Sequence, residues 1–264
     1  MVCTRKANDV DFLDVDIDAL NELHPVATST FKEWNLDVNQ GKTEFVEFRV
    51  ASSDELFEDG KPIRGNEPWC TSKLLGSLMC SVKDINRRCI LGNVAFNSFS
   101  KAWLNSKITL SKKLNVYNAQ VVSVIMYNAS CWAAPKHVLR KLDACHRKHL
   151  RKIMNIKWPR SMISNETLYK RCKTTKLSLK ADAARWKMLG HVLRSDELSP
   201  AQAALRFTVK SMNDMQGRVG RHRDNLFQFI KNDVQKRGLS LNTLDDIIDL
   251  KVIASDRARW RKMF

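Results

Sequence analysis

The sequence of 264 residues lacks several features that would assign it to a class at once. It contains no apolar run approaching the roughly 20 residues that a membrane-spanning helix needs. Residues 1–11 hold no apolar segment ahead of the acidic stretch that follows, so we expect no secretory signal. The apolar fraction of 44% is typical of a globular chain and not of a disordered one. Together these observations predict an intracellular protein, nuclear or cytoplasmic, with one or two folded domains.

The seven cysteines do not have the pattern of a disulfide framework or of a zinc site. Their number is odd and their spacings are irregular, which disfavours structural disulfides in a reducing compartment. Cys145, His146 and His149 lie close in sequence, but no Cys-x-x-Cys pair exists to nucleate a zinc site, which is therefore the weaker alternative. We expect no metal site, with Cys145 in the core and the two histidines on a basic face.

The net charge of +17 is divided unevenly along the chain. Residues 1–70 carry 7 Lys and Arg against 15 Asp and Glu, a net charge of −8. Residues 71–264 carry 38 Lys and Arg against 13 Asp and Glu, a net charge of +25. An excess of this size on a folded segment attracts polyanions, and nucleic acid is the commonest polyanion inside a cell. The two segments are therefore expected to have different roles.

The acidic N-terminal segment has a mixed α/β pattern. Alternating apolar residues indicate a strand at residues 14–18, and a spacing of three and four indicates a helix at 20–34, which Pro25 is expected to break or kink. A strand, a loop and a second short strand are predicted at residues 43–50, 51–69 and 73–79.

From residue 81 onward the apolar spacing is helical. The clearest pattern runs from Val82 to Trp103, and Gly92 on its buried side would let a neighbouring helix come close. Further helices are predicted along the apolar lines Leu110 to Val124, Leu139 to Ile153, Leu179 to Leu193, Leu226 to Val234 and from about Thr243 to the end. Trp103, Trp186 and Trp260 are expected in the core. The predicted fold class is mainly α with a small α/β segment at the N-terminus.

The helix predicted at residues 136–153 is the main candidate for binding nucleic acid. Its basic side chains surround the apolar line, and basic and aromatic residues follow it and recur near residue 220. Lys and Arg contact phosphates without reading sequence, and Trp can stack on unpaired bases. The candidate binding residues are Lys73, Arg140, Lys141, Arg147, Lys148, Arg151, Lys152, Lys157, Trp158, Arg218, Arg221 and Arg223. For any one of these residues, a solvated face is an equally good interpretation.

Short motifs in the N-terminal segment resemble those of the reverse transcriptases of non-LTR retrotransposons. Residues 7–13, Ala-Asn-Asp-Val-Asp-Phe-Leu, resemble the Tyr-Ala-Asp-Asp turn of that family. Residues 39–44, Asn-Gln-Gly-Lys-Thr-Glu, are similar to its Asn-x-x-Lys-Thr-Glu segment. Residues 73–77, Lys-Leu-Leu-Gly-Ser, are similar to the Lys-Tyr-Leu-Gly-Ser of its primer-grip hairpin.

The same resemblance continues to the end of the chain. Residues 85–103 resemble the first thumb helix, and residues 108–132 resemble the helix that ends in Leu-Leu-Tyr-Gly-x-x-x-Trp. Three later segments, 186–194, 217–221 and 256–261, resemble the family's Trp-x-Gly-His-x-x-Arg, Gly-Arg-Pro-x-Arg and Asp-Arg-x-x-Trp-Arg motifs. No single match is specific, but their order and spacing agree over residues 7–264. The resemblance implies a palm remnant at 1–80, a thumb-like bundle at 81–200 and a basic C-terminal segment at 201–264.

The resemblance also implies what the chain does not do alone. Polymerases of this kind hold two metal ions with clustered carboxylates. Here Asp9 is the catalytic remnant of the paired-Asp turn, because Asn8 stands in place of the first Asp and a neutral amide is a poor Mg²⁺ ligand. The upstream Asp of the family and the fingers would precede Met1. We expect no cofactor in this chain, Mg²⁺ in the complete enzyme, and no polymerase activity without a chain that supplies the missing palm and fingers.

The sequence thus predicts a C-terminal fragment of an RNA-directed DNA polymerase that binds primer–template RNA and DNA through its basic helices. Two alternatives stay open. The chain could be the non-functional product of a decayed element, or a module whose basic surface binds an acidic protein. Nucleic-acid binding further requires that the cations gather on one concave surface and do not spread over every side.

Overall fold

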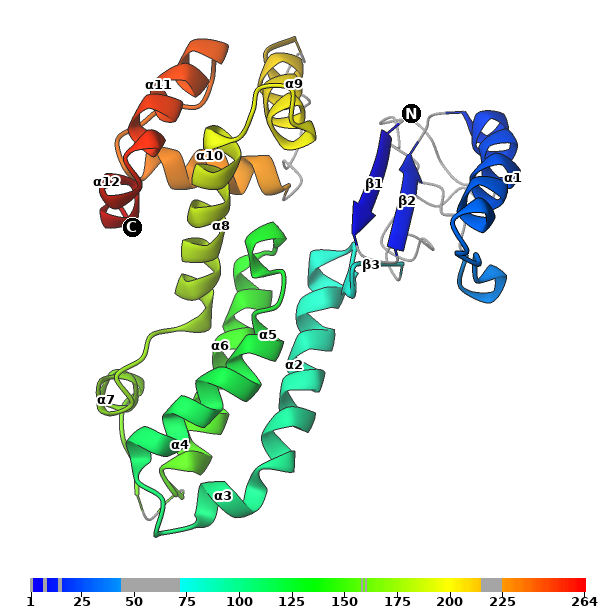
Figure 1. Ribbon diagram of the computed structural model, residues 1–264. Coiled ribbons are helices and arrows are strands. Elements are labelled where there is room, and N and C mark those ends of the chain that lie inside the picture. The colour runs from blue at the N-terminus through cyan, green and yellow to red at the C-terminus, as the bar shows by residue number, and fades with distance from the viewer. Residues whose placement is uncertain are drawn as a thin grey trace, which may run out of the picture. The chain divides into compact units, whose positions relative to one another are not determined.

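The structure is a computed structural model that describes residues 2–6, 9–13, 16–43, 72–157, 159, 161–214 and 225–264 (Figure 1). The described residues are mainly helical, as the sequence predicts. They divide into two units, Met1–Met79 and Cys80–Phe264. Within the described residues, no helix is both long and apolar enough to span a membrane.

The N-terminal unit contains two small antiparallel sheets and one long helix. Strands β1 (Val2–Lys6) and β2 (Asp9–Leu13) form the first sheet. Helix α1 (Ile17–Glu33) begins after Asp16, whose side chain accepts a hydrogen bond from the backbone N–H of Asp18. The strand predicted at residues 14–18 is therefore wrong at Ile17, which begins a helix. Asp16, one of the alternating aspartates, is the cap of that helix. A single 3₁₀ turn, η1 (Gln40–Lys42), follows.

Pro25 lies inside α1 and does not break it. The predicted break is therefore wrong. Pro25 is exposed, and so is Asn21, whose carbonyl loses its helical donor at a proline four residues later. Water can satisfy that carbonyl on an exposed face, which makes the proline tolerable there. The strand predicted at 43–50 and the loop at 51–69 lie outside the described residues, except for Thr43.

The second sheet of this unit is a tight hairpin of β3 (Lys73–Leu74) and β4 (Ser77–Leu78). Its two connecting residues, Leu75 and Gly76, both have positive φ values, of 50° and 77°. Two-residue hairpin loops favour this backbone because its twist matches that of the strands, and glycine adopts it without strain. The short strand predicted at 73–79 is thus a complete two-stranded hairpin.

The C-terminal unit begins with a bundle in which α2 (Ser81–Ser98), the pair α4 (Leu110–Tyr117) and α5 (Ser123–Ile125), and α6 (Lys136–Ile153) lie side by side (Figure 1). The expected helix 82–103 is interrupted at Phe99 and resumes as α3 (Ser100–Leu104). Trp103 is buried, as predicted, and its indole N–H donates to the carbonyl of Phe96 at 2.7 Å.

A π-helical turn, η3 (Asn118–Val122), joins α4 to α5. Such a turn inserts one residue into the helical repeat and rotates the following side chains. As a result Tyr117, Val121, Val122 and Ile125 are all buried. The apolar line predicted for this helix ran on to Val124, which is only half-buried. A 3₁₀ turn, η4 (Ala129–Cys131), and buried Trp132 then lead into α6.

Helix α7 (Asn165–Arg171) connects the bundle to α8 (Leu177–Arg194), which runs on to a second group of helices (Figure 1). The members of that group are α9 (Pro200–Asp214), α10 (Leu226–Gln235), α11 (Leu244–Ser255) and α12 (Arg257–Lys262). Helices α7 and α9 were not predicted. The last predicted helix is divided into α11 and α12, because the Asp256 side chain accepts hydrogen bonds from the backbone N–H groups of Ala258 and Arg259 and so begins a new helix.

The core of this unit forms two clusters of buried apolar side chains. One extends from Ile85 to Ala181 and the other from Trp186 to Trp260, so they meet along α8. In the second, the rings of Trp186 and Trp260 stack at 4.0 Å. Each indole N–H donates to the other residue's carbonyl, at 2.9 and 3.1 Å. Both tryptophans are core residues, as predicted; the domain boundary expected after residue 200 stays a prediction.

Gly92 lies on the side of α2 that packs against Ile125 of α5. A Cβ atom at Gly92 would collide with the side chain of buried Ile125. The sequence-based role of this glycine is thereby confirmed, since no larger residue fits there without moving a core side chain.

Gly92→Ala is expected to lower the free energy of unfolding by about 1–3 kcal/mol, because overpacking outweighs the better helix propensity of alanine. Asn86→Ala, at an exposed position of the same helix, makes the matched control and should be neutral or slightly stabilising. Urea unfolding followed by circular dichroism measures both variants. A Gly92→Ala protein as stable as the control would mean that α2 and α5 do not pack closely at Gly92.

Candidate nucleic-acid interface

The positive charge of the chain is concentrated in one part of the C-terminal unit. Residues 85–181 carry 20 Lys and Arg against two acidic residues, whereas residues 182–264 carry 16 against 10. The first of these ranges includes the first core cluster and all of α6. The cationic excess therefore belongs to helices α2 to α7 and the start of α8, and not to the basic segment as a whole.

Within this bundle, α6 separates its cations from its core side. The seven basic side chains of the helix span about 160° of its circumference at 100° per residue. They are Lys136, Arg140, Lys141, Arg147, Lys148, Arg151 and Lys152, and all are exposed or half-buried. The opposite side holds Val138, Leu142, Leu150 and Ile153, all buried. We call the seven side chains the cationic face of α6.

The two acidic residues of this range leave the cationic face unneutralised. Asp143 is buried and accepts hydrogen bonds from the backbone N–H and the hydroxyl of Ser178, at 3.0 and 2.8 Å. It thus serves the N-terminus of α8, where a carboxylate is favourable. Glu166 lies in the first turn of α7. Among the described residues, no salt bridge involves a Lys or Arg of α6.

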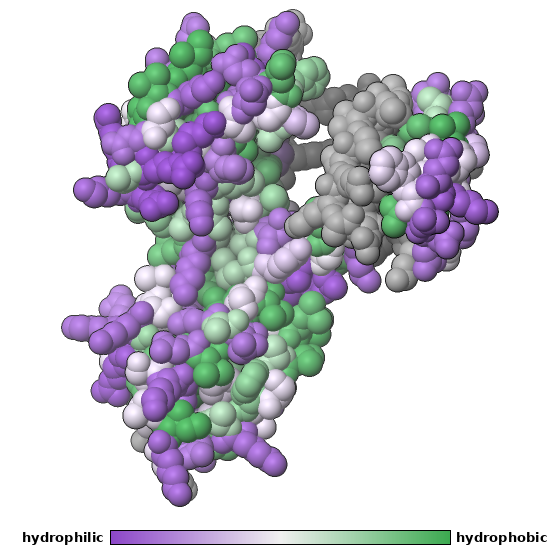
Figure 2. Space-filling model, viewed as in Figure 1, coloured by the Kyte–Doolittle hydropathy of each residue, from purple (hydrophilic) through white to green (hydrophobic). Residues whose placement is uncertain are grey.

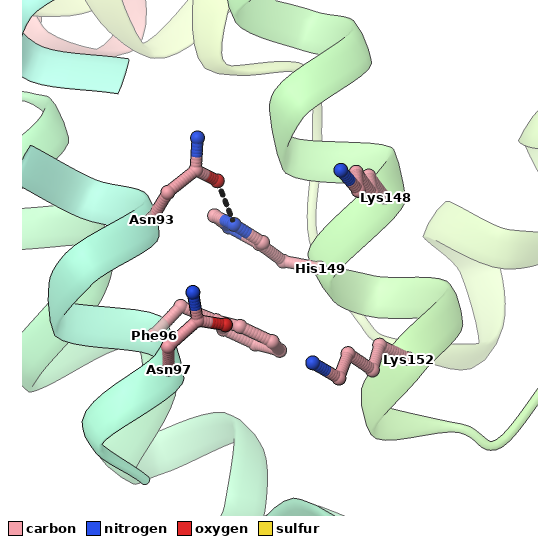
Figure 3. Close-up of a pocket in the computed structure, with 6 residues that line it drawn as sticks. All are labelled: Asn93, Phe96, Asn97, Lys148, His149 and Lys152. Atoms are coloured by element: carbon pink, nitrogen blue, oxygen red, sulfur yellow. Dashed lines mark hydrogen bonds between the residues drawn. The ribbon is translucent and has the colours of Figure 1, made fainter. Parts of the chain in front are cut away.

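A groove runs between the cationic face and α2 (Figure 3). Its volume is about 290 Å³, and it is lined by Asn93, Phe96 and Asn97 of α2 and by Lys148, His149 and Lys152 of α6. The ammonium of Lys152 lies 5.5 Å from the centre of the Phe96 ring. That ring stacks on His149 at 4.1 Å, so its face is occupied inside the protein. The groove therefore offers two ammonium groups and two amides, with no carboxylate in its lining.

The floor of the groove is fixed by a chain of buried hydrogen bonds. The carbonyl oxygen of Asn93 can only accept, so His149 donates from Nε2 at 2.8 Å. The Tyr117 hydroxyl is hydrogen-bonded to Nδ1 of His149 at 3.3 Å and to Nδ1 of His146 at 2.8 Å. The chain orients His149 from inside the bundle, and so holds Asn93 at the wall of the groove.

The expectation that His146 and His149 lie on the basic face is wrong. Both are buried, and Cys145, which was expected in the core, is only half-buried. Burial lowers the pKa of His146 to about 3, with a smaller effect from the charge of Lys180, so the ring is neutral at physiological pH. Their positions in the helical repeat place both histidines on the core side of α6. The prediction relied only on their polarity and was wrong for that reason.

The other predicted binding residues are not all brought together. Lys157 is exposed just after α6, and Lys73 is exposed on β3 in the N-terminal unit. Trp158 and the arginines 218, 221 and 223 lie outside the described residues. Sequence reasoning missed Asn93 and Asn97, although their i, i+4 spacing on one side of α2 was a signal that could have placed them together.

The structure does not assemble a metal site from its described residues. No group of three or more His, Cys, Asp or Glu among them is arranged to hold an ion. Asp9 opens β2 and pairs in register with Lys6 of β1, while Asn8 lies outside the described residues.

Figure 2 shows hydrophilic side chains projecting from the C-terminal unit, with apolar patches between them on the same face.

His146→Gln should reduce the acid sensitivity of the fold. Because the pKa of His146 falls from 6.5 to about 3 on folding, the unfolded chain binds a proton there that the folded chain does not. The stability due to the neutral ring is complete above pH 6.5 and is lost as the pH falls. Urea unfolding between pH 6.5 and about 5, where most carboxylates stay ionised, should show a loss of up to about 1.4 kcal/mol per pH unit in the wild type beyond that in the variant. Equal slopes in the two proteins would show that His146 is not buried and neutral.

Comparison of the chain with protein-family models, with curated proteins and with solved structures finds no match. The resemblance to non-LTR reverse transcriptases therefore rests on the sequence motifs alone.

Proposed function

We propose that the C-terminal unit binds nucleic acid through the cationic face of α6, and that a phosphate of the bound strand occupies the groove between α2 and α6. The observation that carries this proposal is the lack of neutralisation. Residues 85–181 hold 20 cations and two acids, and the acid on α6 is buried against Ser178. A face of this kind keeps its attraction for phosphates, since no neighbouring carboxylate competes for the ammonium and guanidinium groups.

The form of the groove supports a phosphodiester as the ligand. Its volume, about 290 Å³, lies at the lower end of the range of small-molecule pockets, and its polar lining consists of amides and cations. Lys148 and Lys152 are one turn apart, so both ammonium groups can reach the same or adjacent phosphates. Stacking of a base on Phe96 is disfavoured, because His149 and the Lys152 ammonium already occupy its surroundings. Such contacts position a strand without reading its sequence.

The sequence motifs suggest the biological setting. We propose that the chain is the C-terminal part of a non-LTR reverse transcriptase, where the helical bundle would hold the primer–template and a chain with the palm and fingers would supply catalysis. The motifs support this setting, and the mainly helical fold is compatible with it. The electrostatic proposal for α6 does not depend on the setting.

The double variant Lys148→Ala with Lys152→Ala should weaken binding and flatten its salt dependence. If six phosphates of a single strand are neutralised, log K falls with log salt at a slope of about −4. Loss of two phosphate contacts should make the slope shallower by about 1.4. Fluorescence anisotropy of a labelled single-stranded oligonucleotide, as RNA and as DNA, over a series of salt concentrations gives both slopes.

The matched control is Lys187→Ala with Lys210→Ala. These lysines are exposed on α8 and α9, and their substitution removes the same amount of charge from the same unit. It should keep the wild-type slope. Circular dichroism establishes that both double variants are folded. A flat salt dependence in the wild type, or equal losses in the two double variants, would overturn the assignment to α6.

A further inference from the structure

Two cysteines face each other between α2 and α6, beside the groove. Cys89 of α2 and Cys145 of α6 are neighbours, and each thiol shifts the pKa of the other. The Sγ atom of Cys145 also contacts Oδ1 of Asn93 at 3.7 Å. Both cysteines are half-buried, so small solutes can reach them. By contrast, Cys131 contacts Ser130 and Met188, and buried Cys172 contacts Met154.

The pairing of the two helices explains why the thiols meet. Lys152 lies over the Phe96 ring, and His149 donates to Asn93. In each of these contacts the two residues are 56 positions apart in the sequence. Cys89 and Cys145 have the same separation, so α2 and α6 run in the same direction and meet in one constant register. The thiol contact is therefore the next step along an interface that core packing and hydrogen bonds already hold.

The surroundings make the two thiols chemically unequal. The neighbouring Cys89 thiol, with smaller effects of His149 and Lys148, lowers the pKa of Cys145 to about 5. The Cys145 thiol and burial raise the pKa of Cys89, which keeps its proton. The Sγ atom of Cys145 also lies 4.0 Å from Nε2 of His149. A thiolate beside a protonated thiol is the arrangement of a nucleophile and its resolving partner, because the thiolate is the reactive form of cysteine.

We propose that Cys89 and Cys145 are a redox modification site, at which a hydroperoxide converts the two thiols into a disulfide that joins α2 to α6. In the first step, the Cys145 thiolate attacks the hydroperoxide; an S–O bond forms, the O–O bond breaks and the alkoxide or hydroxide leaves. In the second, the Cys89 sulfur attacks the sulfenic sulfur; the S–S bond forms, and the hydroxyl leaves as water with the proton of Cys89. Two thiols are oxidised, and the hydroperoxide is reduced to an alcohol and water, or to two waters from hydrogen peroxide.

Peptide mapping tests this directly. Trypsin releases Cys89 in peptide 89–101 and Cys145 in peptide 142–147, each with no other cysteine. The folded chain is treated with one equivalent of hydrogen peroxide, blocked with N-ethylmaleimide and digested. We expect the disulfide-linked pair of these two peptides to exceed any pair that contains Cys131 by about tenfold. Dithiothreitol should return both peptides to the free form.

Three controls make the result specific. Cys89→Ser should trap Cys145 as a sulfenic acid, which dimedone labels on peptide 142–147. Cys131→Ser should leave the linked pair unchanged. The chain unfolded in urea should instead give scrambled pairs. Absence of the linked pair, or oxidation of Cys131 before Cys145 in the folded wild type, overturns the proposal. The wild-type map decides even if Cys89→Ser fails to fold, and none of these readouts involves nucleic acid.

Discussion

The arrangement of α6 depends on the buried hydrogen bonds that tie its core side to α2 and α4. Hydrogen bonds join Tyr117, His146, His149 and Asn93 in a region where breaking one of them would cost roughly 1–3 kcal/mol. These bonds require one rotation of α6 about its axis. Once that rotation is fixed, the seven cations of the helix have only one direction to point in, which is toward water.

Close packing between helices also helps to fix the arrangement of the C-terminal unit. Gly92 lets Ile125 pack directly on α2, and Gly190 lets the Trp260 ring lie against α8. The second contact also seats the Trp186–Trp260 stack, over which the guanidinium of Arg237 lies at 4.1 Å from the Trp186 ring. In the same cluster Arg185 is buried and paired with Asp233 and Asp182, both at 2.7 Å. The buried pair with Asp233 fixes α10 against α8, because separating either partner would leave a charge without compensation.

Much of this fold follows from the spacing of apolar residues. Leucine, isoleucine and tryptophan positions predicted α2, α6 and α8 and placed Trp103, Trp186 and Trp260 in the core, because burial of large side chains dominates the free energy of such helices. The helix expected from about Thr243 begins there as α11, where Thr243 and Asp246 form a capping box. At the start of α8 the structure differs: Leu177 is buried, whereas Leu179 is 47% exposed, since Asp143 binds Ser178 from another helix.

The errors have a common cause, which is tertiary partners that local rules do not include. Pro25 is tolerated because its side of α1 faces solvent, and the π-helical turn after Tyr117 shifts the buried face within one apolar run. The histidines of α6 were misplaced because polarity was read without asking which side of the helix could satisfy it. The candidate site was predictable to the extent that α6 is basic. The groove was not, because its α2 wall consists of asparagines whose neighbours come from 56 residues further along the chain.

The register between α2 and α6 links the groove and the thiol pair physically. Along the interface, successive turns bring together two thiols, an amide with an imidazole, and an aromatic ring with an ammonium. All three contacts depend on the same spacing and the same parallel direction of two helices. Any change that draws the helices together at Cys89 and Cys145 is transmitted to Asn93 and His149 one turn away, because packed helices move as rigid elements and not as flexible chains. The groove that presents Lys148 and Lys152 therefore lies one helical turn from the proposed redox site.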